Sequence, residues 1–224
     1  ISFHGNAACG MVEPRRGTLD GSRKEPDNER RLKLDAGVRF EFPGFGSAVI
    51  TGFMVGQDDA IVISGKTAVV NGHVLELYEN RDQRQTGIEL ECRSPLIRNA
   101  VRFFATGAVM RSRAEQNGVM RTNREAPQAI ASGGAYYTSG GFDLNALWKY
   151  VSEYESARFA EPGKGPQPLG DFNDVTLTGG YSFGQDKKSR VYLEARNVFD
   201  IRYSTVVGYP DFGRRYTAGY GRVF

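Results

Sequence analysis

Few residues in this chain have the types and spacing that chemistry requires. The only histidines, His4 and His73, stand far apart, and neither has a Cys or His neighbour at the spacing of a metal site. Neither histidine lies beside a nucleophile motif of the kind that a protease or lipase needs. We therefore expect no catalytic residue, no metal ligand and no cofactor, and we predict that the protein is not an enzyme.

Two other features have the residue types of a site, but each lacks a necessary partner. Cys9 and Cys92 are the only cysteines, and the topology inferred below places them on opposite sides of a membrane, which rules out a disulfide between them. The segment Gly163-Lys164-Gly165 has the glycine spacing of a phosphate-binding loop, but no helical pattern follows it. We therefore predict no nucleotide site there.

Composition excludes further classes of function. The 224 residues include 29 Lys or Arg and 26 Asp or Glu, a near balance that gives no field suited to nucleic acid. No stretch approaches about 18 uninterrupted apolar residues, so the sequence predicts no transmembrane helix. The mean hydropathy of −0.44 suits a soluble protein, but it also suits a membrane barrel, because lumen and loop residues dilute a lipid face that uses only alternate positions.

Alternation with a period of two is the strongest pattern in the chain. From Leu32 to Phe42 every second residue is apolar and most residues between are charged, which fits a strand with lipid on one face and water on the other. We predict nine such strands, at about 32–42, 47–63, 86–93, 100–112, 128–138, 142–150, 175–183, 191–196 and 216–224. The sequence thus predicts an all-β fold, a segment of an antiparallel transmembrane β-barrel.

The predicted connections alternate between short and long. Short turns fall at 43–46, 94–99, 139–141 and 184–188, and long polar connections at 64–84, 113–127, 161–171 and 200–212. Outer-membrane barrels show this asymmetry, with short periplasmic turns and long extracellular loops. Residues 1–30 are rich in Gly, Pro, Asn, Asp and charge, so we expect them to form a loop.

The last hairpin carries a family resemblance. It contains Asn197-Val198-Phe199-Asp200, then Tyr203, then Gly213-Arg214-Arg215-Tyr216, and it closes with an alternating strand that stops at Phe224. This hairpin resembles the closing hairpin of the TonB-dependent receptors, the active importers of iron chelates and vitamin B12. The segment Tyr78–Leu96, YENRDQRQTGIELECRSPL, is similar to a second stretch of the same family. Arg222 departs from the pattern, since an apolar or aromatic residue is usual at that place.

The resemblance implies a fold, a location and partners. It implies about nine strands of a 22-stranded barrel in the outer membrane of a Gram-negative bacterium, in contact with lipid. Residues 1–30 would be the remnant of an extracellular loop, and residues 31–224 the C-terminal portion of the barrel. Because nine strands that start outside break the even-number rule, we expect a signal peptide, a plug and the box that contacts the TonB complex to lie in a missing N-terminal part. Tyr216, Tyr220 and Phe224 are expected to form the signal read by the barrel assembly machinery.

The implied function is TonB-energised import of an iron siderophore, cobalamin or another scarce nutrient. On the family's plan, extracellular loops and plug bind the ligand together. Basic residues of the predicted loops are candidates to attract an anionic metal chelate or vitamin: Arg81, Arg84, Arg113, Arg121, Arg124 and Lys164. The alternatives are a small structural or adhesive outer-membrane barrel completed by another chain, and a soluble β protein.

Overall fold

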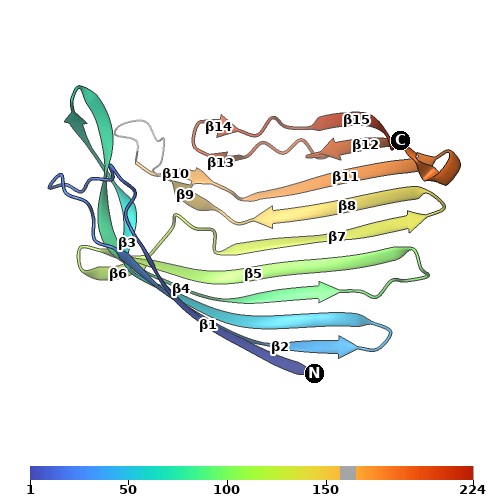
Figure 1. Cartoon of the computed structure of the whole chain (residues 1–224), viewed down its shortest axis with the longest axis horizontal. Coiled ribbons are helices and arrows are strands. Elements are labelled where there is room, and N and C mark those ends of the chain that lie inside the picture. Colours follow the sequence, from blue (N-terminus) through green and yellow to red (C-terminus); the bar gives the residue numbers. More distant parts are fainter. Residues whose placement is uncertain (157–164, 224) are drawn as a thin grey trace.

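One large antiparallel sheet dominates the protein (Figure 1). The computed structural model describes residues 1–156 and 165–223. Ten strands follow one another across the sheet, and a short strand, β6, pairs with β5 beside them. Their bounds are β1 Ser2–Val12, β2 Glu29–Phe42, β3 Gly46–Val70, β4 His73–Arg93, β5 Val101–Gln116, β6 Val119–Thr122, β7 Ala129–Ser139, β8 Phe142–Val151, β11 Phe172–Phe183, β12 Ser189–Arg196 and β15 Arg215–Arg222.

Smaller elements decorate the long connections. The strands β9 (Tyr154–Ser156) and β10 (Gln167–Leu169) pair with each other, as do β13 (Ser204–Val206) and β14 (Tyr209–Pro210). A three-residue 3-10 turn, η1 (Gln185–Lys187), joins β11 to β12. No helix in the described part of the chain has the length and apolar character needed to cross a membrane.

The strand register separates two faces of the sheet. Residues directly opposite each other on paired strands share a face, so the pairs Leu34 with Met54 and Ile50 with Leu90 lie on one side. We call this side the apolar face; it also carries Ile88, Val109, Leu144, Leu177 and Leu193. The opposite side, the polar face, carries Lys33, Asp35, Arg39, Glu89, Asp143 and Arg190. The predicted alternation is therefore confirmed in the structure.

The sheet has no hydrophobic core of its own. Its accessible surface is 15344 Å², whereas a compact monomer of this mass would expose about 10,000 Å². Large side chains on the apolar face lie in the open, with Val109 68% and Leu193 67% exposed. An exposed apolar surface of this extent is typical of a face that contacts lipid or another protein.

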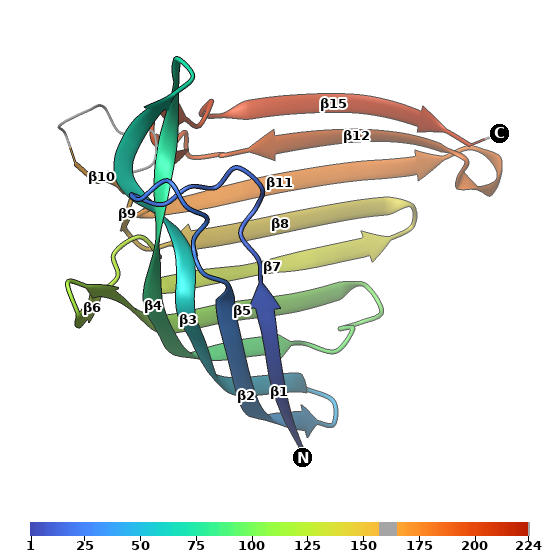
Figure 2. The same cartoon turned by 60° about the vertical axis from the view of Figure 1, so that its left-hand side comes forward.

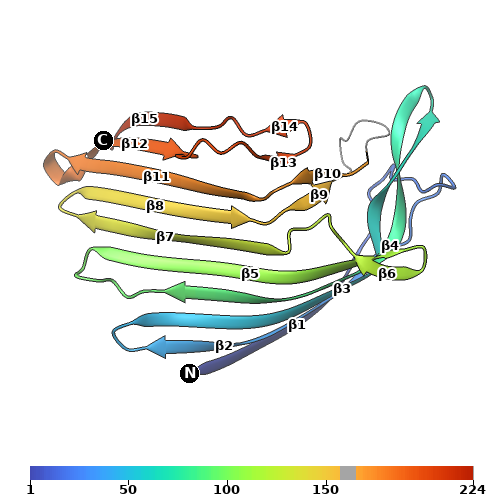
Figure 3. The same cartoon turned by 180° about the vertical axis from the view of Figure 1, so that it is seen from behind.

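The sheet is twisted and curled but does not close (Figures 2 and 3). The edge strands β1 and β15 each pair on one side only within the described chain. The predicted fold class, a segment of an antiparallel barrel wall, agrees with this arrangement. Open edges leave backbone N–H and C=O groups of β1 and β15 unpaired within the described chain.

The predicted loop at residues 1–30 is wrong for its first part. Ser2–Val12 form β1, which pairs with β2 from Ser2 opposite Arg39 to Val12 opposite Glu29. The alternation in β1 is faint in the sequence because Gly and Ala occupy several of its positions. The sheet therefore has ten long strands rather than the nine predicted, and the strand count is even. Both described ends lie at the short-turn end of the sheet (Figure 1).

Two predicted long loops contain well-formed hairpins. The connection predicted at 64–84 is the far part of β3 and β4, which turn at Asn71 and Gly72. The connection predicted at 113–127 contains a similar turn, at Asn117 and Gly118, between β5 and β6. All four turn residues have positive φ, as a tight hairpin turn demands. The Asn-Gly pairs were the signal that the sequence interpretation overlooked.

Candidate functional site

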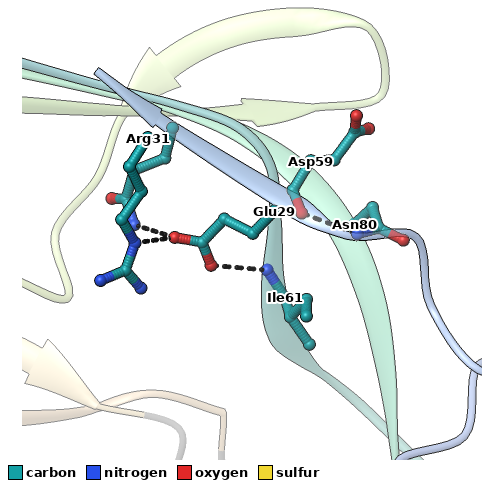
Figure 4. A network of polar contacts seen from close by, with 6 residues as sticks. Glu29, Arg31, Asp59, Ile61 and Asn80 are labelled. Carbon is teal, nitrogen blue, oxygen red and sulfur yellow. Dashed lines mark hydrogen bonds and ion pairs between the residues drawn. The ribbon is translucent and has the colours of Figure 1, made fainter. Parts of the chain in front are cut away.

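A polar network around Glu29 organises the long-connection end of the sheet (Figure 4). Glu29 is buried, with 4% of the residue exposed. One carboxylate oxygen accepts hydrogen bonds from Arg31 and, at 2.9 Å, from Gln57, and the other accepts from the Ile61 backbone N–H at 3.4 Å. The network therefore joins the start of β2 to the part of β3 that continues beyond the apolar face.

Asn80 ties the segment between β1 and β2 to the same region. Its side-chain oxygen accepts from the Asp27 backbone N–H at 2.9 Å, and its side-chain nitrogen donates to the Asp27 and Asp59 carbonyls at 2.9 and 2.7 Å. A backbone hydrogen bond from Tyr78 to Leu19 adds a further contact. One amide thus joins three segments that lie far apart in sequence; its contact with Asp59 is drawn in Figure 4.

This framework positions the hairpin of β3 and β4 that projects past the other strands (Figure 1). The ladder between the two strands has irregularities between Gln57 and Ala60 and between Ile63 and Thr67. Such bulges increase local twist and re-aim a strand. Ala60 and Leu77 are 2% and 6% exposed, so the base of the hairpin is packed.

The register divides the predicted arginines of the first two loops between the two faces. Arg81 has the parity of the polar face and forms an ion pair with Glu79. Arg84 and Arg113 are direct partners on β4 and β5 and have the parity of the apolar face. Arg84 donates to Asp58 at 2.9 Å. These arginines were predicted in the connections 64–84 and 113–127, and the structure places all three within the strands β4 and β5.

The remaining predicted basic residues lie in three settings. Arg121 pairs with Ala114 on the polar-face side of the β5–β6 hairpin and is exposed. Arg124 follows β6 and forms an ion pair with Glu155 at 3.2 Å. Lys164 lies outside the described residues.

Fixed ion pairs line the polar face. Arg93 meets Glu91 at 2.8 Å and Arg190 meets Asp143 at 2.6 Å. Lys33 with Asp35 at 3.7 Å and Arg39 with Glu41 at 3.5 Å are looser. Exposed pairs of this kind add little stability, so their main effect is to give the wall a dense, balanced charge facing water.

A small polar pocket near the long-connection end was missed by the sequence interpretation. It has a volume of about 330 Å³, and its lining includes Asp174, Glu194, Arg196, Tyr203, Asp211 and Arg215. The Tyr203 ring stacks on Phe172 with ring centroids 3.8 Å apart, and its hydroxyl donates to Asp174 at 3.3 Å. The family-like motif from Asn197 to Tyr203 contributes Asn197 and Tyr203 to this pocket, so the sequence does carry a signal for its position.

The electrostatics of this pocket keep Tyr203 neutral. Burial of the phenol, reinforced by the charges of Asp174 and Asp211, raises the pKa of Tyr203 to about 12. Asn197, 2% exposed, anchors the loop through hydrogen bonds between its side chain and the backbone of Ile201. The pocket thus forms a polar, hydrogen-bonded end to the sheet.

The described residues were also compared with the requirements of a metal site. No group of three or more His, Cys, Asp or Glu side chains among them is placed to hold a metal ion. Cys9 lies in β1 and Cys92 in β4, and both are free. The candidate functional site is therefore built from the wall and the rim at its long-connection end.

Solved structures with a similar fold indicate the class of barrel to which this sheet is similar. The copper transporter OprC matches over 98% of this chain with a TM-score of 0.73 at 19% identity. The ferripyoverdine receptor of the outer membrane of Pseudomonas aeruginosa matches over 98% with a TM-score of 0.73 at 14% identity. The siderophore receptor PirA from Acinetobacter baumannii matches over 99% with a TM-score of 0.70 at 16% identity. This chain has the barrel fold of the TonB-dependent receptors.

The match to the TonB-dependent receptor barrel covers a part of each solved protein. This chain spans 37%, 30% and 39% of the three structures in the order given. No protein-family model and no curated protein sequence matches it. The resemblance proposed from the closing hairpin is confirmed at the level of the fold, and the neighbours are outer-membrane receptors and transporters rather than enzymes.

Two of the three residues expected to guide assembly lie on the apolar face of β15. Tyr216 and Tyr220 pair with Ala195 and Val191, and they are 73% and 61% exposed. Tyr216 borders an apolar-face groove of about 710 Å³. Phe224, the third predicted member, lies outside the described residues.

Proposed function

We propose that this chain is part of the wall of a TonB-dependent importer in the outer membrane of a Gram-negative bacterium. The observation that carries the proposal is the pairing of an exposed apolar face with a charged polar face over ten strands that match receptor barrels along nearly the whole chain. In such a barrel the apolar face contacts lipid and the polar face lines the lumen. The energy for import would come from the TonB complex, acting through a plug.

The cargo that we propose is an anionic metal chelate or a vitamin of the siderophore or cobalamin class. The long-connection end would face outside and present the rim built on Glu29 and Asn80. Of the predicted arginines, Arg81 and Arg121 have the polar-face parity that points cations toward the lumen. Arg124 belongs to the predicted connection 113–127 and Lys164 to the predicted connection 161–171. We propose that their positive charges also attract a negatively charged ligand.

We also propose that Tyr216, Tyr220 and Phe224 guide the barrel assembly machinery. Tyr216 and Tyr220 lie on the apolar face of β15, where a partner could read them before lipid covers them. Phe224→Ala, in the protein expressed from its own gene, should lower the amount recovered in the outer membrane. Unchanged recovery would count against the signal.

The experiment that tests the import function is uptake by the intact bacterium. Cells with and without the gene receive radiolabelled ferric siderophores and cobalamin, in backgrounds with and without TonB. Loss of uptake of one compound on deleting either gene supports the proposal. Normal uptake of every compound, with the protein present in the outer membrane, would favour the alternative of a structural or adhesive barrel completed by another chain.

A further inference from the structure

A cluster of arginines on the apolar side of the sheet has no role in the proposed import path. Arg111 pairs with Thr86 and Arg113 with Arg84, and Thr86 and Arg84 pair in turn with Met54 and Gly56. Since directly opposite residues share a face, Arg84, Arg111 and Arg113 extend the apolar face rather than the polar one. Cations in these positions point away from any ligand in the lumen.

These arginines begin where the apolar surface ends. Along β5 the apolar-face residues are Phe103, Ala105, Gly107 and Val109, followed by Arg111 and Arg113. Along β4 they are Cys92, Leu90, Ile88 and Thr86, followed by Arg84. In a membrane barrel this boundary is the level of the lipid headgroups, where an arginine can keep its stem on apolar surface and its guanidinium in the polar layer.

Two of the three guanidinium groups lack a protein partner in the described part of the chain. Arg84 leans over Gly56 and donates to Asp58 at 2.9 Å. Arg111 and Arg113 are exposed and take part in none of the described ion pairs or side-chain hydrogen bonds. The apolar-face acids of these two strands, Asp82 and Glu115, come only farther from the apolar surface.

We propose that Arg111 and Arg113, with Arg84 beside them, bind the phosphate groups of a lipid in the outer leaflet. This inference rests on the proposed membrane position of the wall. Guanidinium groups match phosphate oxygens in geometry and charge, and they remain protonated at every physiological pH. At the long-connection end the facing leaflet is the outer one, whose phosphorylated lipid in Gram-negative bacteria is lipid A. Headgroup phosphates held there would also relieve the repulsion between Arg84 and Arg113.

The test is a titration with lipid A followed by native mass spectrometry, on protein expressed from its own gene and held in neutral detergent. The main variant is Arg111→Gln with Arg113→Gln. The control is Arg121→Gln, which removes the same charge from the same β5–β6 hairpin on the other face. We expect about fivefold weaker binding for each arginine lost, the effect of one cation near an anionic lipid surface, and no change for the control. Equal losses in both proteins would overturn the proposal.

The lipid probe separates the possible sources of phosphate. Wild-type protein should bind bisphosphorylated lipid A more tightly than the dephosphorylated form, and free inorganic phosphate should bind far more weakly. Equal binding of phosphorylated and dephosphorylated lipid A, or tight binding of phosphate alone, would overturn the proposal even if the double variant fails to fold. Arg111→Lys with Arg113→Lys keeps the charge and should retain most of the affinity.

Fractionation of the same cells keeps the two proposals distinct. Absence of the wild-type protein from the outer membrane would defeat the proposed function. Its presence there, together with lipid A binding that ignores Arg111 and Arg113, would defeat only the lipid site.

Discussion

The ring of Tyr192 on β12 occupies the space above Gly219 on β15, its direct partner in the sheet. A Cβ atom at position 219 would overlap the Tyr192 ring. The same arrangement recurs on the polar face where Phe53 covers Gly87 and Phe104 covers Gly134. At these three positions the absence of a glycine side chain leaves room for the aromatic ring of the neighbouring strand. The three ring–glycine contacts contribute to the packing of the polar face.

Gly219→Ala should destabilise the sheet by about 1–3 kcal/mol, because overpacking forces the Tyr192 ring and its neighbours to shift. Gly221→Ala is the matched control, since position 221 shares the strand and the face but has nothing within 4 Å of an added Cβ. The measurement is urea unfolding followed by the gel mobility of the folded and unfolded forms. Equal effects of the two substitutions would show that the ring contact is irrelevant.

Glu29→Ala should loosen the projecting β3–β4 hairpin. It removes the acceptor for Arg31, Gln57 and the Ile61 backbone, and a hydrogen bond to a charged group contributes about 1.5–3 kcal/mol. Limited proteolysis should cut between residues 58 and 82 faster in the variant. Glu41→Ala is the control, because Glu41 has a similar Arg two residues away in the same strand but is exposed. The interpretation fails if both variants are cut at the wild-type rate.

Tyr203 should give the protein a specific sensitivity to alkali. Its pKa is about 12 in the folded protein and about 10 when unfolded, so the folded state retains a proton that the unfolded state loses. The resulting stabilisation is fully present below pH 10 and is lost as the pH rises through 12. Tyr203→Phe keeps the stack on Phe172 and should flatten the fall in stability between pH 10 and 12. The difference in tyrosinate absorbance between the two proteins measures the titration directly, and a midpoint near 10 would contradict the assignment.

Arg113→Gln should leave stability unchanged or raise it by a few tenths of a kcal/mol in neutral detergent. Like charges directly opposite across a ladder are unfavourable, and Arg113 faces Arg84. Thermal unfolding in neutral detergent tests this. Arg121→Gln is the control, because Arg121 lies opposite Ala114 and its loss removes no repulsion between like charges. A clear loss of stability would mean that Arg113 has a stabilising partner in the folded protein.

The sequence by itself determined the fold class and the two faces of the wall. Strict alternation between Leu32 and Phe42 assigns each side chain to lipid or water, because successive strand residues point to opposite sides whatever the partner strand. The closing hairpin with Asn197 and Tyr203 likewise indicated the receptor barrel through its residue types and their spacing. Both are patterns of residues close together along the chain, so they can be recognised from the sequence without the structure.

The tertiary structure alone decided the first strand, the projecting hairpin and the distribution of the arginines. β1 contains small residues whose alternation is faint, and its pairing with β2 reveals it. Arg84 and Arg121 both looked like loop cations, but the face on which each lies depends on strand register. A shift of one residue in register exchanges the two faces, and register is fixed by hydrogen bonds between strands distant in sequence. That long-range information is absent from the spacing of residues along the chain.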